Sequence, residues 1–375
     1  MRFSPPSMPM AEDLTAAQGW LEKIHALPLD QEVRVMNVCG GHERSLTQQG
    51  LRGVLPAKVK LIPGPGCPVC VCPEEDIAEA IALAMSREVT LVAFGDMLRV
   101  PINAAKGEVR SLAEARAQGA DIRPIASPRE AVALAAAQAP RPVVFFAAGF
   151  ETTTAPVAAM LAEGAPDNLS VLLSARLTWP AVDMLLRADA TSLDALIAPG
   201  HVATVMGADE WGFIPHRHHL PVAVAGFSAN SLLAALYSVL RQKLAGKPFL
   251  DNCYPELVTP KGNKRAQALL AQVLEVRDAT WRGIGTIPAS GFALNSAYAH
   301  FDARARFQPA ALPRRHAGEM PPGCDCASVV LGRKPPTECR LYGRACTPRA
   351  PIGPCMVSDE GACHIWWQAG ERPAA

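Results

Sequence analysis

The sequence predicts an α/β protein with two parallel sheets, followed by a small cysteine-rich segment. Short apolar, β-branched runs alternate with alanine-rich helical stretches over most of the 375 residues. This alternation is typical of parallel strands that helices cover on both faces. From about Phe301 the chain is instead rich in Pro, Gly, Arg and Cys and has little apolar periodicity. A segment of this kind lacks its own hydrophobic core, so we expect a metal to hold it together.

The elements follow in chain order. Residues 11–27 carry apolar side chains at helical spacing and predict an amphipathic helix. The predicted strands are 33–38, 59–62, 90–94, 143–147, 170–174, 195–198 and 222–225. The predicted helices are 74–86, 111–118, 128–138, 155–163, 180–187, 229–245 and 264–276. We expect four parts: residues 1–30, a helix packed on the C-terminal domain, an α/β domain at 31–125, a second at 126–300, and the cysteine-rich domain at 301–375.

Composition narrows the function classes. A chain of 375 residues exceeds the roughly 250–300 residues of a single core, which favours two or three domains. The formal net charge of +1 gives no overall field for nucleic acid or membrane. No apolar run is long enough to span a bilayer, and the N-terminus lacks the apolar region of a signal peptide. We therefore expect a cytoplasmic protein without nucleic-acid or membrane partners, in which thiols stay reduced unless they are catalytic or bind metal.

Two groups of cysteines are the most informative feature of the chain. Three lie between Cys67 and Cys72, and six lie between Cys324 and Cys363. Thiolates are the soft ligands that zinc and iron–sulfur clusters need. Because six thiols are two more than one cluster takes, they suggest a cluster beside a dithiol. The positive surroundings of these thiols would stabilise thiolates and offset an anionic cluster.

The first motif is Asn-Val-Cys-Gly-Gly-His-Glu at residues 37–43. It follows a predicted strand, so Cys39 should lie at a strand's carboxyl end, where α/β sheets bind ligands. The two glycines should let a ligand or partner approach closely. Cys39, His42 and Glu43 offer a soft ligand, an imidazole and a carboxylate. The alternative is an inert cysteine buried beside a turn.

The second motif is Pro-Gly-Pro-Gly-Cys-Pro-Val-Cys at residues 63–70, again after a strand. Cys67 and Cys70 have the spacing of a thioredoxin-like redox pair, which is also half of a zinc site. The acidic residues 74–76 indicate a helix N-terminus just beyond them, which favours thiolates. A structural zinc ion would need two more ligands, of which Cys72 could supply one. We favour redox or transition-metal chemistry.

Two further motifs also follow predicted strands. Gly-Phe-Glu-Thr-Thr-Thr-Ala-Pro at 149–156 forms a helix cap or an anion site, but it lacks the spacing of a nucleotide-binding loop. Pro-Gly-His-Val-Ala-Thr-Val-Met-Gly at 199–207 places His201 in a cleft or in a structural role. The close trio of His216, His218 and His219 fits an exposed loop as well as a ligand set.

These four motifs, with the ending Cys-Thr-Pro…Gly-Pro-Cys-Met-Val-Ser-Asp-Glu-Gly-Ala-Cys at 346–363, resemble the HypD family of nickel–iron hydrogenase maturation factors from about Val33 to Trp367. The resemblance implies two Rossmann-like α/β domains and a smaller domain with a 4Fe-4S cluster. It also implies a part in building the Fe(CN)2CO group of these hydrogenases. The implied partners are a small HypC-type chaperone and a HypE-type cyanide donor, which a HypF-type protein charges from carbamoyl phosphate.

The resemblance implies roles for individual cysteines. Cys39 matches the thiolate that binds iron(II) carrying cyanide and CO, with His42 close beside it. Cys67 and Cys70 match a redox pair that can also hold iron. The remaining matches fall in the tail, where the implied cluster ligands are Cys324, Cys339, Cys346 and Cys363, and the implied dithiol is Cys326 and Cys355.

Three residues depart from the family pattern. Cys72 stands where the family has Thr, Asp359 stands where Ser is usual, and Cys253 matches no family role. On this basis we expect an assembly scaffold with redox activity rather than a conventional turnover enzyme. The alternatives are a stand-alone thiol–disulfide oxidoreductase fed by a 4Fe-4S cluster and a zinc-stapled binding protein.

Overall fold

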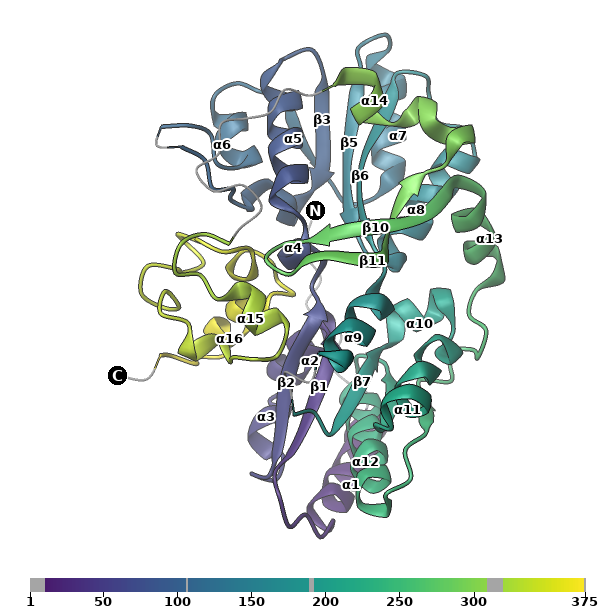
Figure 1. Ribbon diagram of the computed structural model, residues 1–375, viewed down its shortest axis with the longest axis vertical. Helices are drawn as coiled ribbons and strands as arrows, with labels where there is room; N and C mark the ends of the chain where they lie inside the picture. The colour runs from purple at the N-terminus through teal and green to yellow at the C-terminus, as the bar shows by residue number, and fades with distance from the viewer. Residues whose placement is uncertain (1–10, 106, 189–191, 309–319, 374–375) are drawn as a thin grey trace.

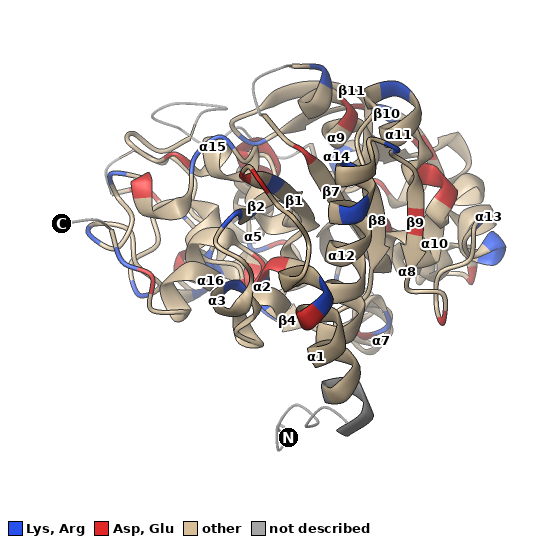
Figure 2. Ribbon diagram, turned by 90° about the horizontal axis from the view of Figure 1, so that it is seen from below, with Lys and Arg blue, Asp and Glu red and all other residues tan. Residues whose placement is uncertain are grey.

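The computed structural model describes residues 11–105, 107–188, 192–308 and 320–373. It confirms the predicted α/β class: two sheets that contain parallel strands are covered by helices, and the cysteine-rich segment lies beside the junction of the two (Figure 1). Basic and acidic residues are interspersed over the elements seen in Figure 2. None of the helices within the described ranges combines the length and the apolar character that a bilayer crossing requires.

The first sheet has five parallel strands in the order β2-β1-β7-β8-β9. These strands are β1 (Val33–Cys39), β2 (Val59–Gly66), β7 (Ala195–Pro199), β8 (Val222–Ala225) and β9 (Leu250–Cys253). Val35 and Met36 are both fully buried, but they belong to different core clusters. Since successive side chains of a strand point to opposite faces, both faces of this sheet are covered.

The second sheet has six strands in the order β10-β11-β6-β5-β3-β4. Four are parallel: β3 (Thr90–Phe94), β4 (Ile122–Ile125), β5 (Val143–Gly149) and β6 (Leu169–Arg176). The other two form an antiparallel hairpin that pairs with the edge of β6: β10 (Leu274–Trp281) and β11 (Gly285–Leu294). Phe145 and Phe146 are completely buried on opposite faces, so this sheet is also covered on both sides.

Helices connect the strands, and several begin at side-chain caps. Ser111, Ser228 and Asn263 each accept a hydrogen bond from the backbone N–H three residues later, which satisfies one of the unpaired donors of a helix start. The α-helices are α1 (Ala11–His25), α2 (Gly40–Gln48), α3 (Leu51–Val54), α4 (Pro68–Val71), α5 (Glu74–Met85), α6 (Leu112–Ala117), α7 (Pro128–Gln138), α8 (Glu151–Ala162), α9 (Thr178–Arg187), α10 (Gly200–Met206), α11 (Phe213–His218), α12 (Ala229–Ala245), α13 (Lys264–Val273), α14 (Ala303–Phe307), α15 (Cys326–Val330) and α16 (Ala362–Gln368). The 3-10 helices are η1 (Gly95–Arg99), η2 (Ala208–Gly212), η3 (Ser296–Phe301), η4 (Pro336–Glu338) and η5 (Pro354–Met356).

The chain passes between the two sheets three times. It builds β1 and β2 in the first sheet, β3 to β6 in the second, β7 to β9 in the first again, and the β10–β11 hairpin in the second. This order differs from the expected division at residues 125 and 126, because that boundary separates β4 from β5 within one sheet. Here β1 pairs with both β2 and β7, so each sheet joins distant parts of the chain.

Helix α1 packs on α12, whereas we expected it to pack on the cysteine-rich domain. Trp20 Nε1 donates a hydrogen bond to Asn230 Oδ1 at 2.9 Å, and its ring contacts Tyr237. Ala17 and Ile24 belong to the same core cluster as the buried leucines of α12. The apolar stripe of α1 therefore covers the first sheet's own helix layer.

The cysteine-rich segment shares its core with the second sheet. Val329, Tyr342 and Met356 are buried in the same cluster as Ile77 of α5 and Trp281 of β10. The segment thus lacks apolar periodicity because it packs as a layer on the second sheet and its helices. This contact positions the tail cysteines against α4 and the β10–β11 turn.

Candidate metal and redox site

Cys39 lies at the carboxyl end of β1, directly before α2, as its motif predicts. The β1–β2 register is regular up to Asn37 and then shifts, so that Cys39 pairs with Gly66. A Cβ atom added to Gly66 would lie 1.9 Å from the Val38 carbonyl oxygen, so only glycine permits this approach. Cys39 and Cys67 therefore leave adjacent strands at the same sheet edge.

The glycines after Cys39 serve a different purpose from the one expected. A Cβ on Gly40 would lie 2.4 Å from the Glu360 carbonyl oxygen, and one on Gly41 would lie 2.7 Å from the Phe227 ring. The space beside this turn is therefore occupied by the chain itself. Gly40 and Gly41 bring the tail and the loop after β8 against Cys39, instead of leaving an opening at those two positions.

Cys67 and Cys70 form a disulfide bond. Cys67 caps α4, and Cys70 lies within that helix. Both are buried. The acidic residues 74–76 do open a helix, α5, but the two cysteines sit in a separate short turn before it. A redox role for this pair stays a prediction, and its geometry allows the oxidised form.

Two small cavities meet at Cys39. One is lined by Cys39, Cys67 and Cys70, together with Cys355 from the tail. The other is lined by Cys39 with Thr153 and Thr178, and with His201 of the 199–207 motif. Glu360 lines both cavities. All the motifs found in the sequence thus converge on one thiol.

His42 is completely buried beside this site. Its Nε2 lies 3.0 Å from the Ala225 carbonyl oxygen, which can only accept, so Nε2 carries the proton of the neutral ring. Its Nδ1 has no hydrogen-bond partner within the described part of the chain. Burial lowers the pKa of His42 from 6.5 to about 4, so at neutral pH the ring offers an unprotonated nitrogen.

The Cys39 thiol is protonated in the absence of metal. Burial, followed by the charge of Glu360, raises its pKa to about 12, while the backbone N–H groups of His42 and Gly41 act in the opposite direction. Any metal ion that this thiol bound would therefore have to displace the proton. Burial and the charge of Asp96 also raise the pKa of Glu360 to about 7.

Glu43 is a structural anchor and not a ligand. Its carboxylate accepts hydrogen bonds from Arg52 Nη2 at 2.5 and 2.6 Å, from Asn37 Nδ2 at 2.7 Å and from Trp366 Nε1 at 2.6 Å. With these partners it joins α2, β1 and α3 to α16, three residues beyond Cys363. The carboxylate named in the first motif thus fixes the tail against the Cys39 turn.

Four of the six tail cysteines gather into one largely buried cluster. The Sγ atoms of Cys326, Cys355 and Cys363 all lie within 4.8 Å of one another, and Cys324 Sγ is 3.2 Å from Cys326 Sγ. A Cβ on Gly353 would lie 2.5 Å from both Cys324 Sγ and Cys326 Sγ, so these thiols pack against bare backbone. The close trio combines one cysteine that resembles a cluster ligand with both cysteines that resemble the dithiol.

The donor set of the tail fits a metal or an iron–sulfur group. Hydrogen bonding to Cys326 raises the pKa of Cys355 well above its ordinary value, whereas hydrogen bonding from Cys326 lowers the pKa of Cys324. Thiols this close cannot all ionise unless a cation compensates them. Among the described residues, the trio Cys326, Cys355 and Cys363 is the group of metal-ligating side chains that meets in this way.

The family model described as "HypD: Hydrogenase formation hypA family" matches residues 15–370. The chain belongs to the HypD family. The hydrogenase expression/formation protein HupD of Azotobacter chroococcum mcd 1 is 42% identical over 354 residues, which cover 92% of this chain and 91% of that protein. The hydrogenase maturation factor HypD of Azotobacter vinelandii has the same identity and coverage. HypD of Escherichia coli (strain K12) is 39% identical over 343 residues, 90% of each chain.

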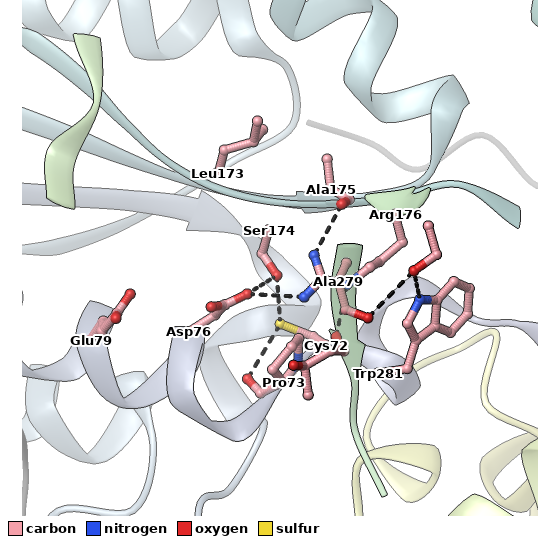
Figure 3. A network of polar contacts seen from close by, with 12 residues as sticks. Cys72, Pro73, Asp76, Glu79, Leu173, Ser174, Ala175, Arg176, Ala279 and Trp281 are labelled. Carbon is pink, nitrogen blue, oxygen red and sulfur yellow. Dashed lines mark hydrogen bonds and ion pairs between the residues drawn. The ribbon is translucent and has the colours of Figure 1, made fainter. Parts of the chain in front are cut away.

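Cys72, which departs from the HypD pattern, lies in a polar network (Figure 3). Its Sγ is 3.4 Å from Ser174 Oγ, which donates to Asp76 Oδ2 at 2.5 Å, and Asp76 also pairs with Arg176. Burial raises the pKa of Cys72 to about 12. The disulfide therefore belongs to Cys67 and Cys70, and Cys72 is a buried packing thiol.

Other candidate residues lie away from the site. His218 Nε2 lies 2.8 Å from Asp183 Oδ1, a hydrogen bond that holds α11 against α9. Cys253 ends β9, where burial raises its pKa to about 12. The residue that sequence reasoning missed is Glu360, and its only signal was its place in the ending motif of the HypD resemblance.

Proposed function

We propose that this HypD-family protein is a scaffold and redox factor in hydrogenase formation. On it, iron(II) would be held through Cys39 together with a small HypC-type chaperone. Cyanide would come from a HypE-type partner, with a HypF-type protein upstream, to build the Fe(CN)2CO group. The observation that carries the proposal is the cavity where Cys39 meets Cys67, Cys70 and a tail cysteine. The relatives' names support a role in hydrogenase formation.

The iron is cargo in this proposal, and the chain's own groups prepare its site. Cys39 loses its proton on binding iron(II), and the backbone N–H groups of Gly41 and His42 stabilise the thiolate that results. The neutral His42 ring, with its unprotonated Nδ1, adds no positive charge that would repel the metal. A buried thiolate is the soft donor that iron with cyanide and CO ligands prefers.

The resident group would be a 4Fe-4S cluster held by Cys324, Cys339, Cys346 and Cys363. When bound, it would supply one-electron redox chemistry. Cys326 and Cys355 would be the adjacent dithiol, and Cys355 lines the cavity that Cys67 and Cys70 also line. Reduction of the Cys67–Cys70 disulfide takes two electrons and two protons and yields two thiols. Because the scheme needs reduced thiols elsewhere, we place the protein in the cytoplasm.

Complementation tests the proposal. In a host that lacks its own HypD, Cys39→Ala should leave hydrogenase activity at background, while Cys253→Ala should restore it as wild type does. Cys253 is the matched control because it is a partly buried cysteine that lines neither cavity at Cys39. Full activity of Cys39→Ala would contradict the proposed iron ligand.

The second candidate is a stand-alone thiol–disulfide oxidoreductase fed by the cluster. The disulfide at Cys67 and Cys70, next to tail thiols, favours it because this arrangement needs neither iron cargo nor a partner. Steady reduction of a model protein disulfide by the isolated protein, at a rate that Cys67→Ser abolishes, would support this function. Absence of turnover together with successful complementation would support the scaffold.

A further inference from the structure

Arg282 lies in the turn of the β10–β11 hairpin, where that hairpin meets the cysteine-rich segment. Its backbone N–H donates to the Val71 carbonyl oxygen at 2.9 Å, at the end of the helix that contains Cys70. A Cβ on the next residue, Gly283, would lie 2.9 Å from Ala327 Cβ, and Ala327 directly follows Cys326. The turn thus stands between the disulfide helix and the tail cysteines.

The Arg282 side chain is completely buried but incompletely paired. Its Nη2 donates to the Pro101 carbonyl oxygen at 2.7 Å and lies 3.8 Å from Glu74 Oε2, with both side chains 0% exposed. Its Nε and Nη1 have no hydrogen-bond partner among the described residues. A buried charged donor without an acceptor is costly, so an acceptor is expected at these two nitrogens.

The thiols near Arg282 indicate where that acceptor belongs. The turn that carries Arg282 touches both groups of thiols. The Arg282 N–H binds the carbonyl of Val71, next to Cys72, and Gly283 faces Ala327, next to Cys326, whose Sγ is 3.2 Å from Cys324 Sγ. Cys72 already contacts Ser174 within a network where Arg176 and Arg304 neutralise Asp76. Cys324, in contrast, belongs to the buried thiol cluster that fits an anionic metal group.

We propose that Arg282 donates a hydrogen bond from one of its two unpaired nitrogens, Nε or Nη1, to the iron–sulfur group beside Cys324 and Cys326 and thereby raises the reduction potential of that group. This inference rests on the proposed function, which supplies the cluster. Reduction adds one electron, and a buried positive charge with N–H donors stabilises the more negative product. Because the same residue binds the Val71 carbonyl, the potential would be tuned from the segment that carries the Cys67–Cys70 pair.

The test is a redox titration of the anaerobically reconstituted full chain, followed by electron paramagnetic resonance. Arg282→Met removes the charge and the donors but keeps a long apolar stem. At a fixed potential, we expect its ratio of reduced to oxidised cluster to fall at least tenfold, a midpoint shift of about 59 mV to more negative values for one electron. Arg282→Lys keeps the charge and should recover part of this shift.

Arg304→Met is the matched control. Arg304 is likewise an ion-paired arginine, although it is only partly buried, and it binds Asp76 and Glu79. Its removal should leave the midpoint unchanged. If Arg282→Met is insoluble, Arg282→Lys decides, because loss of the planar donor fork must still shift the midpoint or the spectrum.

Two results would overturn the inference. An unchanged midpoint and spectrum in the Arg282 variants, with the iron content of wild type, would refute the role of Arg282 and leave the proposed function intact. Absence of any iron–sulfur signal from reconstituted wild-type protein would refute the proposed cluster and, with it, this inference. The wild-type titration therefore separates the two failures before any variant is made.

Discussion

Replacement of Glu43 by Gln tests how the tail is attached to the Cys39 turn. The carboxylate is buried and accepts four hydrogen bonds, two of them from the Arg52 guanidinium. The glutamine amide that replaces the carboxylate has one acceptor oxygen. Its NH2 group would face the donor groups of Asn37 or Trp366 and could not accept their hydrogen bonds. Loss of one partner of a buried ion pair costs about 3–5 kcal/mol, and Arg52 is about a quarter exposed, so we expect about 3 kcal/mol.

The assay is urea unfolding at pH 7, followed by tryptophan fluorescence, since Trp366 reports on this contact. Glu114→Gln is the control, because the Arg110–Glu114 pair is largely exposed and should contribute less than about 1 kcal/mol. In a double-mutant cycle followed by circular dichroism, because Trp366→Phe removes the fluorescent reporter, Glu43→Gln and Trp366→Phe should be non-additive by about 1 kcal/mol. Additive effects, or a loss no larger than that of Glu114→Gln, would refute the anchoring role.

Three further outcomes follow from the site. Burial holds the pKa of His42 at about 4 against an ordinary 6.5, so the contribution of the neutral ring to the free energy of unfolding is complete above pH 6.5 and falls by about 3 kcal/mol toward pH 4. The unfolding free energies of wild type and His42→Gln should therefore converge as the pH falls, and a difference that stays constant with pH would contradict this. Gly66→Ala should abolish soluble yield, since its Cβ would meet a β1 carbonyl oxygen, whereas Gly53→Ala, with nothing within 4 Å, should be tolerated; equal yields would remove the steric argument. Cys326→Ser combined with Cys355→Ser should keep the visible iron–sulfur absorption but abolish maturation, and loss of that absorption would make these thiols ligands.

Much of the fold can be predicted from the sequence because most of the strands are buried on both faces and therefore appear as short, continuous apolar runs. All seven predicted strands are present, from β1 at Val33–Cys39 to β8 at Val222–Ala225. The missed β10–β11 hairpin has the opposite character: Val276 and Arg277 are exposed on β10, so its pattern resembles a helix surface or a loop. The helix predicted at 264–276 accordingly runs past the end of α13 at Val273, because Leu274 already pairs with Leu294 on β11.

The site could be predicted in part for a related reason. Strand ends placed Cys39 and Cys67 correctly, since parallel strands share a carboxyl edge. No periodic signal could bring Cys355 to the same cavity, because the tail is held by contacts such as Trp366 with Glu43, 323 residues apart. The partition of six tail thiols between a cluster and a dithiol likewise came from the family resemblance, and it stays a prediction.

Infrared spectroscopy of the purified protein with its chaperone tests the central claim most directly. The account predicts bands of iron-bound cyanide and CO in wild type and in Cys253→Ala. It predicts their loss in Cys39→Ala, which should still fold and keep its iron–sulfur absorption, because the tail thiols do not include Cys39. Bands of full intensity in Cys39→Ala would contradict the claim and would place the iron elsewhere, at Cys67 and Cys70.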